Sequence, residues 1–187
     1  MKSTGRLFVI SAPSGTGKTT VVRRLLSHYP HVLESISYTT RTPRVGEVHG
    51  TAYYFVERTT FERLVREGFF AEWAEVHGAL YGTPAEPIRS ALTRGDHVVL
   101  DIDVQGGMTL KKAFPEAATI FLMPPSEDEL KRRLRGRGTE AEDAIARRLT
   151  NAHREMTFKD RYEYCVINDE VDRAVAEIAK IMGLNRG

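Results

Sequence analysis

A glycine-rich segment near the N-terminus constrains the fold of this chain more than any other feature. It follows an apolar run from Leu7 to Ser11, typical of a buried strand, and it precedes a helical pattern from Lys18 to His28. A strand, a glycine loop and a helix in this order are the context of a phosphate-binding loop. The segment, with the residue after it, consists of Ala12, Pro13, Ser14, Gly15, Thr16, Gly17, Lys18, Thr19 and Thr20.

The residue types in this segment predict that it binds a nucleoside triphosphate. Gly15 and Gly17 allow backbone N–H groups to close around a phosphate, and the helix N-terminus adds the positive end of its dipole. Lys18 is placed to reach the β- and γ-phosphates, and the Thr19 hydroxyl to bind Mg²⁺. Ala12 stands where the motif has its first glycine, a change that a negative φ tolerates. The motif alone does not identify the reaction.

The rest of the chain alternates apolar runs with helical patterns, which predicts an α/β fold. We expect a mostly parallel sheet covered by helices on both faces. The expected later strands are 36–39, 53–56, 69–74, 97–101, 119–123 and 164–167, and the expected later helices include 87–93, 108–114, 142–156 and 171–182. Two further helices are expected at capping boxes, Thr59 with Glu62 and Ser126 with Glu129. The stretch 35–83 is richer in short strands and turns, which indicates an inserted subdomain.

Two carboxylates lie at the end of the strand expected at 97–101. Asp101 and Asp103 share one side of the strand by its period of two. In open α/β sheets, ligands bind beyond the carboxyl ends of the strands. We therefore expect one of these carboxylates to orient Mg²⁺ or a water bound to it. A solvated strand end without a ligand is the alternative.

The composition of the chain limits which partners it is expected to bind and in which compartment of the cell it is expected. The net charge of +2 gives no bulk electrostatic case for binding nucleic acid or a membrane surface. The chain lacks both the ~20 apolar residues of a membrane span and the apolar stretch of a signal peptide, so we expect a cytoplasmic protein. Cys165 is the single cysteine, which excludes an internal disulfide, and its apolar neighbours predict a buried thiol. A homo-oligomer is compatible with the sequence.

A longer stretch of the chain resembles a known enzyme family. The segment SYTTRTPRVGEVHGTAYYFV at 37–56 closely resembles the signature of guanylate kinases. The likeness continues in order through Glu72-Trp73-Ala74, Tyr81-Gly82-Thr83, Asp101-Ile102-Asp103, Arg135-Gly136-Arg137-Gly138 and Val166-Ile167-Asn168-Asp169. It therefore extends over nearly the whole chain.

This resemblance implies one domain over 1–187 with the fold of P-loop NTPases. The core is expected at 1–34, 84–130 and 157–187, with a GMP-binding subdomain at about 35–83 and a helical lid at about 131–156. The implied activity is Mg²⁺-assisted, in-line transfer of the γ-phosphate of ATP to GMP, and to dGMP, in purine nucleotide metabolism.

The resemblance also assigns an acceptor site. Its residues for GMP are Ser37, Arg41, Arg44, Tyr53, Glu72, Tyr81, Thr83, Asp101, Asp103 and Arg148. Guanidinium and phenol donors among them suit the phosphate dianion of GMP. Glu72 is expected to accept hydrogen bonds from N1–H and N2–H₂ of guanine, while the hydroxyls of Ser37 and Thr83 meet O6.

The resemblance also assigns the residues of the ATP site and of the lid. Catalysis is expected from Lys18, Arg44, Arg137 and Arg148. ATP is expected to contact the phosphate loop, Arg133, Arg137 and, near the adenine, Asn168. Mg²⁺ is expected on Thr19 and, through water, on Asp101. Arginines at a helix end also complement the helix dipole, but that reading explains one or two of them rather than the cluster at 132–137.

Three other functions compete with this interpretation. A scaffold domain that binds phosphopeptides in the GMP groove would lack the loop lysine, whereas this chain has Lys18. A kinase for a sugar phosphate is disfavoured by the intact acceptor segment with Arg41, Arg44 and Glu72. A GTPase would need an Asn-Lys-x-Asp segment to read the base, and the sequence contains none.

Overall fold

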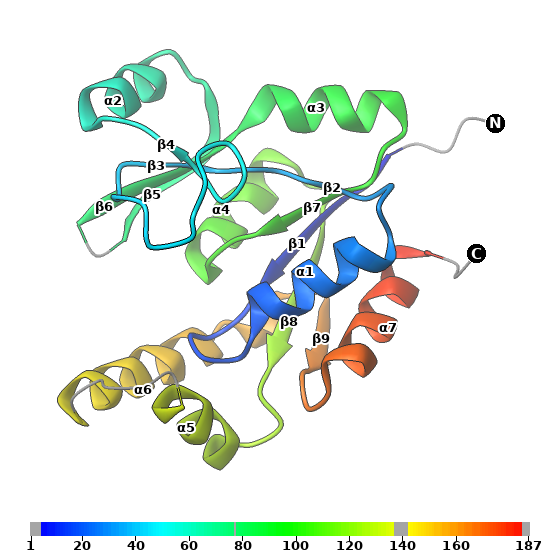
Figure 1. Ribbon diagram of the computed structural model, residues 1–187. Coiled ribbons are helices and arrows are strands. Elements are labelled where there is room, and N and C mark those ends of the chain that lie inside the picture. Colours follow the sequence, from blue (N-terminus) through cyan, green and yellow to red (C-terminus); the bar gives the residue numbers. More distant parts are fainter. Residues whose placement is uncertain (1–4, 77, 137–141, 185–187) are drawn as a thin grey trace.

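The central element of the computed structural model is a parallel sheet of five strands (Figure 1). The structure describes residues 5–76, 78–136 and 142–184. The strand order is β2-β7-β1-β8-β9. The strands are β1 (Leu7–Ser11), β2 (Leu33–Glu34), β7 (Val98–Asp101), β8 (Ala118–Met123) and β9 (Tyr164–Ile167). The predicted α/β fold with a parallel sheet is therefore confirmed.

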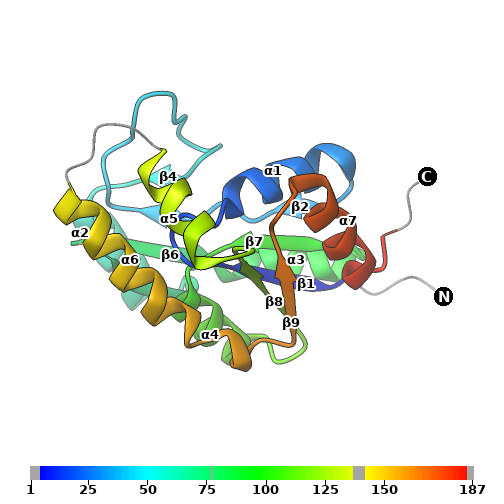
Figure 2. The same ribbon diagram turned by 90° about the horizontal axis from the view of Figure 1, so that it is seen from below.

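Alternating side chains of β1 supply the cores on the two faces of this sheet. Phe8 and Ile10 pack with residues of α1 (Lys18–His28) and α7 (Val171–Met182). Leu7 and Val9 pack with residues of α3 (Ala85–Arg94) and α4 (Val104–Ala113). Figure 2 shows α1 and α7 on one side of the strands and α4 on the other. Because both faces are covered, every residue of β1 is buried, and all but the last, Ser11, are apolar.

A second sheet of four strands lies beside the first, in the order β4-β3-β6-β5. Its strands are β3 (Tyr38–Thr39), β4 (Tyr54–Phe55), β5 (Phe70–Val76) and β6 (Ala79–Pro84). Helix α2 (Arg58–Arg66) packs on it, with the ring of Phe61 stacked on that of Phe70 at 4.6 Å between centroids. Contacts between α4 and β5 join the second sheet to the rest of the molecule.

Two helices complete the end of the molecule that carries the glycine loop. Helix α5 (Glu127–Arg135) and helix α6 (Glu142–Met156) share an apolar cluster that includes Leu134 and Ala152. Leu134 also lies against the loop, since a Cβ on Gly15 would come within 2.6 Å of its Cδ2. A 3₁₀ turn, Lys159–Arg161, leads from α6 into β9.

Several local predictions are corrected by the structure. Helix α2 begins at Arg58 without a side-chain cap, and Glu62 pairs with Arg58 instead of closing a capping box with Thr59. The second box forms only in part, because Ser126 accepts from the Glu129 N–H at 3.2 Å while the Glu129 carboxylate binds arginines. Strands β2 and β6 were not predicted.

The predicted burial of Cys165 is wrong, because its side chain is exposed. Strand β9 lies at the edge of the sheet and pairs with β8 alone. Only Val166 of β9 is buried, in the cluster that contains α7 residues. Within the described part of the chain, no helix is long and apolar enough to cross a membrane.

Candidate active site

The glycine loop between β1 and α1 brings three functional side chains together. Gly15 and Gly17 have φ angles of +90° and +94°, which glycine adopts without the strain of a Cβ. Lys18 Nζ lies 2.7 Å from Asp101 Oδ1 and donates to the Ile102 carbonyl at 2.6 Å. Thr19 Oγ1 donates to Asp101 Oδ2 at 3.2 Å.

The sheet topology explains why Asp101 meets this loop. Strand β7 runs parallel to β1 and directly beside it, so both strands end at the same edge. The hydroxyl of Thr19 and the carboxylate of Asp101 are hard oxygen donors of the kind that Mg²⁺ prefers. In the described residues, no group of three or more His, Cys, Asp or Glu side chains forms a metal site. This donor set suits an ion that takes its other ligands from phosphates and water.

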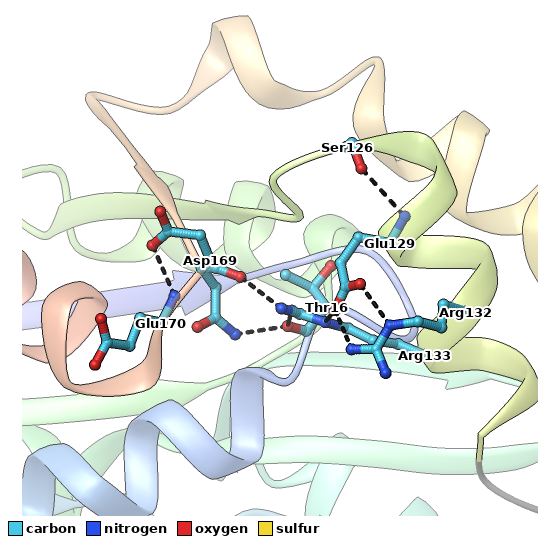
Figure 3. Close-up of polar contacts among 8 residues, drawn as sticks. Thr16, Ser126, Glu129, Arg132, Arg133, Asp169 and Glu170 are labelled. Atoms are coloured by element: carbon cyan, nitrogen blue, oxygen red, sulfur yellow. Dashed lines mark hydrogen bonds and ion pairs between the residues drawn. The ribbon is translucent and has the colours of Figure 1, made fainter.

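Arg133 of α5 fastens the loop to two other segments. Its guanidinium donates to the Thr16 carbonyl and to the Asn168 carbonyl, each at 2.9 Å. Its Nε donates to Glu129 Oε1 at 2.7 Å, and Figure 3 shows Arg133 reaching toward Thr16. Asn168 Nδ2 donates to the same Thr16 carbonyl at 2.7 Å. Arg133 and Asn168, both predicted to contact ATP, thus meet at the loop.

A further loop contact was missed by the sequence analysis. The backbone N–H of Ser14 donates to Glu155 Oε2 at 2.8 Å, from the last turn of α6. An acidic residue near the end of a helix carries no local signal that it will reach a loop so distant in the sequence. The rest of the predicted loop lies as expected between β1 and α1, with Ala12 buried and Thr20 exposed on α1.

A buried carboxylate marks a second polar site, on β5. Glu72 is only 6% exposed, and Thr83 Oγ1 on β6 donates to its Oε1 at 2.6 Å. Ser37 Oγ lies 3.5 Å from Thr83 Oγ1, so the three predicted base-contacting residues form one cluster. Burial raises the pKa of Glu72 to about 7, with a smaller contribution from the charge of Asp103.

The start of α4 borders this cluster. Asp103 caps the helix and accepts from the N–H groups of Gln105 at 2.8 Å and Gly106 at 3.0 Å. A Cβ on Gly106 would come within 3.1 Å of Glu72 Oε2, so the glycine lets the helix approach the carboxylate. Asp103, predicted as one of the GMP residues, thus also caps this helix.

A third group of side chains lies on the second sheet and its β3–β4 loop. Arg41 Nε donates to the hydroxyl of Tyr81 at 3.2 Å, and its guanidinium lies 5.5 Å from the ring centre of Tyr53. Burial raises the pKa of Tyr53 to about 12, which keeps its hydroxyl protonated as a donor. Glu47, which the sequence analysis left without a role, binds Arg41 through both carboxylate oxygens.

The structure gives less detail for three of the predicted arginines. Arg44 is exposed, and its backbone N–H donates to Glu47 at 2.7 Å. Arg148 lies half-buried on α6. Arg137 lies outside the described residues.

Comparisons with known proteins agree with this geometry. The guanylate kinase family model matches residues 4–184. A guanylate kinase of Oleidesulfovibrio alaskensis is 52% identical over 93% of this chain and 84% of its own length. One of Geobacter metallireducens is 45% identical over 100% of this chain and 92% of its own. The crystal structure of guanylate kinase from Anaplasma phagocytophilum, 33% identical, superposes with a TM-score of 0.82 and covers 98% of this chain and 87% of that one. The chain belongs to the guanylate kinase family.

Proposed function

We propose that this protein transfers the γ-phosphate of ATP to GMP, forming ADP and GDP. One observation carries the proposal: a phosphate loop with its lysine and a buried, hydroxyl-bound carboxylate occur in one chain, on neighbouring sheets. The first feature suits the triphosphate of the donor, and the second suits the guanine of the acceptor. Membership of the family supports the same reaction.

ATP would bind at the loop between β1 and α1. Backbone N–H groups of the loop and the N-terminus of α1 would face its phosphates, with Lys18 moving from Asp101 to the β- and γ-phosphates. Thr19, directly, and Asp101, through water, would hold Mg²⁺, which supplies charge neutralisation of the phosphates. Asn168 would lie near the adenine, and Arg133 would reach the phosphates by giving up the Thr16 carbonyl.

GMP would bind at the second sheet. Ionised Glu72 would accept from N1–H and N2–H₂ of guanine, and Thr83 and Ser37 would face O6. Adenine presents a different pattern of donors and acceptors at these positions, so the cluster would select guanine. The GMP phosphate would be held by Arg41, Arg44, Tyr53 and Tyr81. Asp101 and Asp103 would border the nucleotide.

The transfer itself needs positioning and charge stabilisation. An anionic oxygen of the GMP phosphate attacks the γ-phosphorus of ATP, the bond to the β–γ bridging oxygen breaks, and ADP leaves. No general base is required, because the attacking oxygen carries no proton. Lys18, Arg44, Arg137 and Arg148 would stabilise the charge on the transferred group, with Arg148 bridging the two substrates. The segments 35–83 and 131–156 would close over the substrates and exclude water.

A coupled assay of ADP release tests this function. The protein receives ATP and Mg²⁺ with GMP, dGMP, AMP, UMP or CMP in separate reactions. We expect fast turnover with GMP, turnover with dGMP, and little with AMP, UMP or CMP. Binding of GMP without turnover of any nucleotide would instead favour a binding module. Turnover of a sugar phosphate would mean that the acceptor site binds a different substrate from the one proposed.

A further inference from the structure

Glu47 occupies a central position in the loop between β3 and β4. Its Oε1 accepts from Arg41 Nη2 at 2.9 Å, and its Oε2 accepts from Arg41 Nη1 at 3.0 Å. The same Oε2 also accepts from the backbone N–H of Arg44 at 2.7 Å. One carboxylate therefore joins both arginines that are proposed to hold the GMP phosphate.

These bonds restrict the guanidinium of Arg41. A planar guanidinium meets a carboxylate as a two-pronged fork, which fixes its plane as well as its distance. Arg41 Nε donates to the Tyr81 hydroxyl at 3.2 Å and Nη1 to the Thr42 carbonyl at 2.8 Å. Of the five N–H groups of an arginine, the bonds within the described residues engage four and leave one on Nη2 for a further acceptor.

Partial burial strengthens this arrangement. The side chains of Arg41 and Glu47 are 17% and 21% exposed. The hydrogen bond from Arg41 lowers the pKa of Glu47, which keeps the carboxylate ionised near neutral pH. The guanidinium also lies 5.8 Å from the ring centre of Phe55, on β4. Arg41 is therefore held in one orientation before any substrate arrives.

We propose that Glu47 is a positioning residue for the acceptor phosphate, an inference that rests on the proposed function. It sets the plane of the Arg41 guanidinium and the course of the main chain at Arg44. Preorganised donors bind more tightly because the entropy of ordering them is not lost on binding. The arrangement has an opposing effect, since Glu47 places a negative charge close to the site for a phosphate dianion.

The two effects change the affinity for GMP in opposite directions, so a variant without the charge of Glu47 distinguishes between them. The Glu47→Gln variant keeps the size of the side chain and removes its negative charge. If Glu47 acted only as a counter-ion of Arg41, the variant would bind GMP more tightly, because the phosphate site would become more positive. If Glu47 positions the arginines, the variant binds GMP more weakly, because an amide NH₂ cannot accept the second guanidinium bond.

The experiment compares Glu47→Gln and Glu47→Asp with a matched control, Glu62→Gln. Glu62 lies on α2 and accepts from Arg58 at 2.9 Å on the exposed face, so its variant also breaks an Arg–Glu pair near the second sheet. The measurements are KM and kcat for GMP, KM for ATP, and the Kd values of GMP and guanosine by titration calorimetry. Guanosine lacks the phosphate and reports on the base site alone.

We expect Glu47→Gln to raise the KM and Kd of GMP about tenfold, which corresponds to the loss of one charge-assisted hydrogen bond. The Kd of guanosine and the KM of ATP stay at the wild-type values. Glu47→Asp retains the charge and gives a smaller increase for GMP, and Glu62→Gln leaves every constant unchanged.

Two results would overturn the inference. An unchanged or lower Kd of GMP in Glu47→Gln would leave only the counter-ion role. An equal weakening of guanosine and GMP binding would mean that Glu47 supports the fold of the second sheet rather than the phosphate site. The proposed function has a separate readout, because it fails if the wild-type protein forms no GDP from GMP and ATP.

Discussion

Thr83 donates a 2.6 Å hydrogen bond to the buried carboxylate of Glu72, across the pair of strands β5 and β6. This bond stabilises the ionised form of Glu72, yet burial outweighs it and the pKa rises to about 7. The carboxylate of the proposed guanine site therefore changes its charge in the physiological pH range. Only the ionised form can accept hydrogen bonds from both N1–H and N2–H₂ of guanine.

We predict that the affinity for guanosine increases with pH. With a pKa of about 7, the ionised fraction of Glu72 rises about tenfold from about pH 6 to about pH 8, and the affinity should rise with it. Guanosine is the proper ligand because the phosphate of GMP titrates in the same range. Calorimetry at several pH values measures the effect, and a Glu72→Gln variant should show weaker binding and a flat profile. A flat profile in the wild-type protein would contradict the prediction.

The raised pKa of Glu72 also predicts how this residue affects the stability of the folded protein as the pH changes. Its pKa is higher in the folded than in the unfolded state, so between about pH 4.5 and 7 the folded protein binds more protons at this site. The contribution of Glu72 to the free energy of unfolding therefore falls as the pH rises through this range. Urea unfolding should show Glu72→Gln gaining stability relative to wild type between pH 5 and pH 8. A constant difference between the two proteins would argue against the shift.

Lys18 is predicted to act on transfer rather than on acceptor binding. Its ammonium lies beside Asp101 at the edge of the main sheet where β1 and β7 end, whereas Glu72 and Thr83 lie on strands of the second sheet. Lys18→Ala should lower kcat about 10²–10³-fold, because a positive charge at the transferred phosphate is lost. The Kd of GMP should stay near the wild-type value. Lys180→Ala, on the exposed side of α7, is the control, and near-normal turnover of Lys18→Ala would exclude the role.

The sequence predicted every strand of the main sheet except the two-residue β2, because the other four are defined by local apolar patterns. Strands β1 and β9 and helices α1 and α7 have the predicted bounds. Helix α4 begins at Val104, earlier than predicted, because Asp103 caps it and Gly106 and Gly107 are helical. A Cβ on Gly107 would lie 2.7 Å from the Tyr162 hydroxyl, a packing demand that no local pattern reveals.

Contacts between distant parts of the chain also limited how much of the candidate site could be predicted from the sequence. Glu72 and the phosphate loop could be proposed as site residues from the sequence, because Glu72 matches a family motif and the loop has a characteristic spacing of its own. Glu47 and Glu155 were missed as contacts, since each acquires its role through a partner that the fold brings near. The exposure of Cys165 depends on β9 being an edge strand, which its apolar neighbours in sequence do not show.

Arg133 is predicted to support the phosphate loop, whereas its neighbour Arg132 is not. Both bind Glu129, but Arg133 also donates to the carbonyls of Thr16 and Asn168, while the side chain of Arg132 is 74% exposed. Arg133→Ala should lower the free energy of unfolding by about 1.5–3 kcal/mol, the usual cost of losing hydrogen bonds to a charged group. It should also weaken ATP binding with little effect on GMP. Arg132→Ala should change neither, and equal effects of the two substitutions would refute the distinction.

We predict that the parts of the protein that carry the donor and acceptor sites close together when both substrates are bound. The donor site lies on the main sheet and the acceptor site on the second sheet, which is joined to the main body largely through α4 and β5. Transfer requires the two phosphates to come into reacting distance with water excluded, so the two parts should move together when both sites are filled. Small-angle scattering should show a smaller radius of gyration with GMP and a non-hydrolysable ATP analogue than with either alone. Guanosine with the same analogue is the control, since it fills the base site without the phosphate that Arg41 and Arg44 would hold. An unchanged radius with both nucleotides would mean that the sites already lie in reacting position.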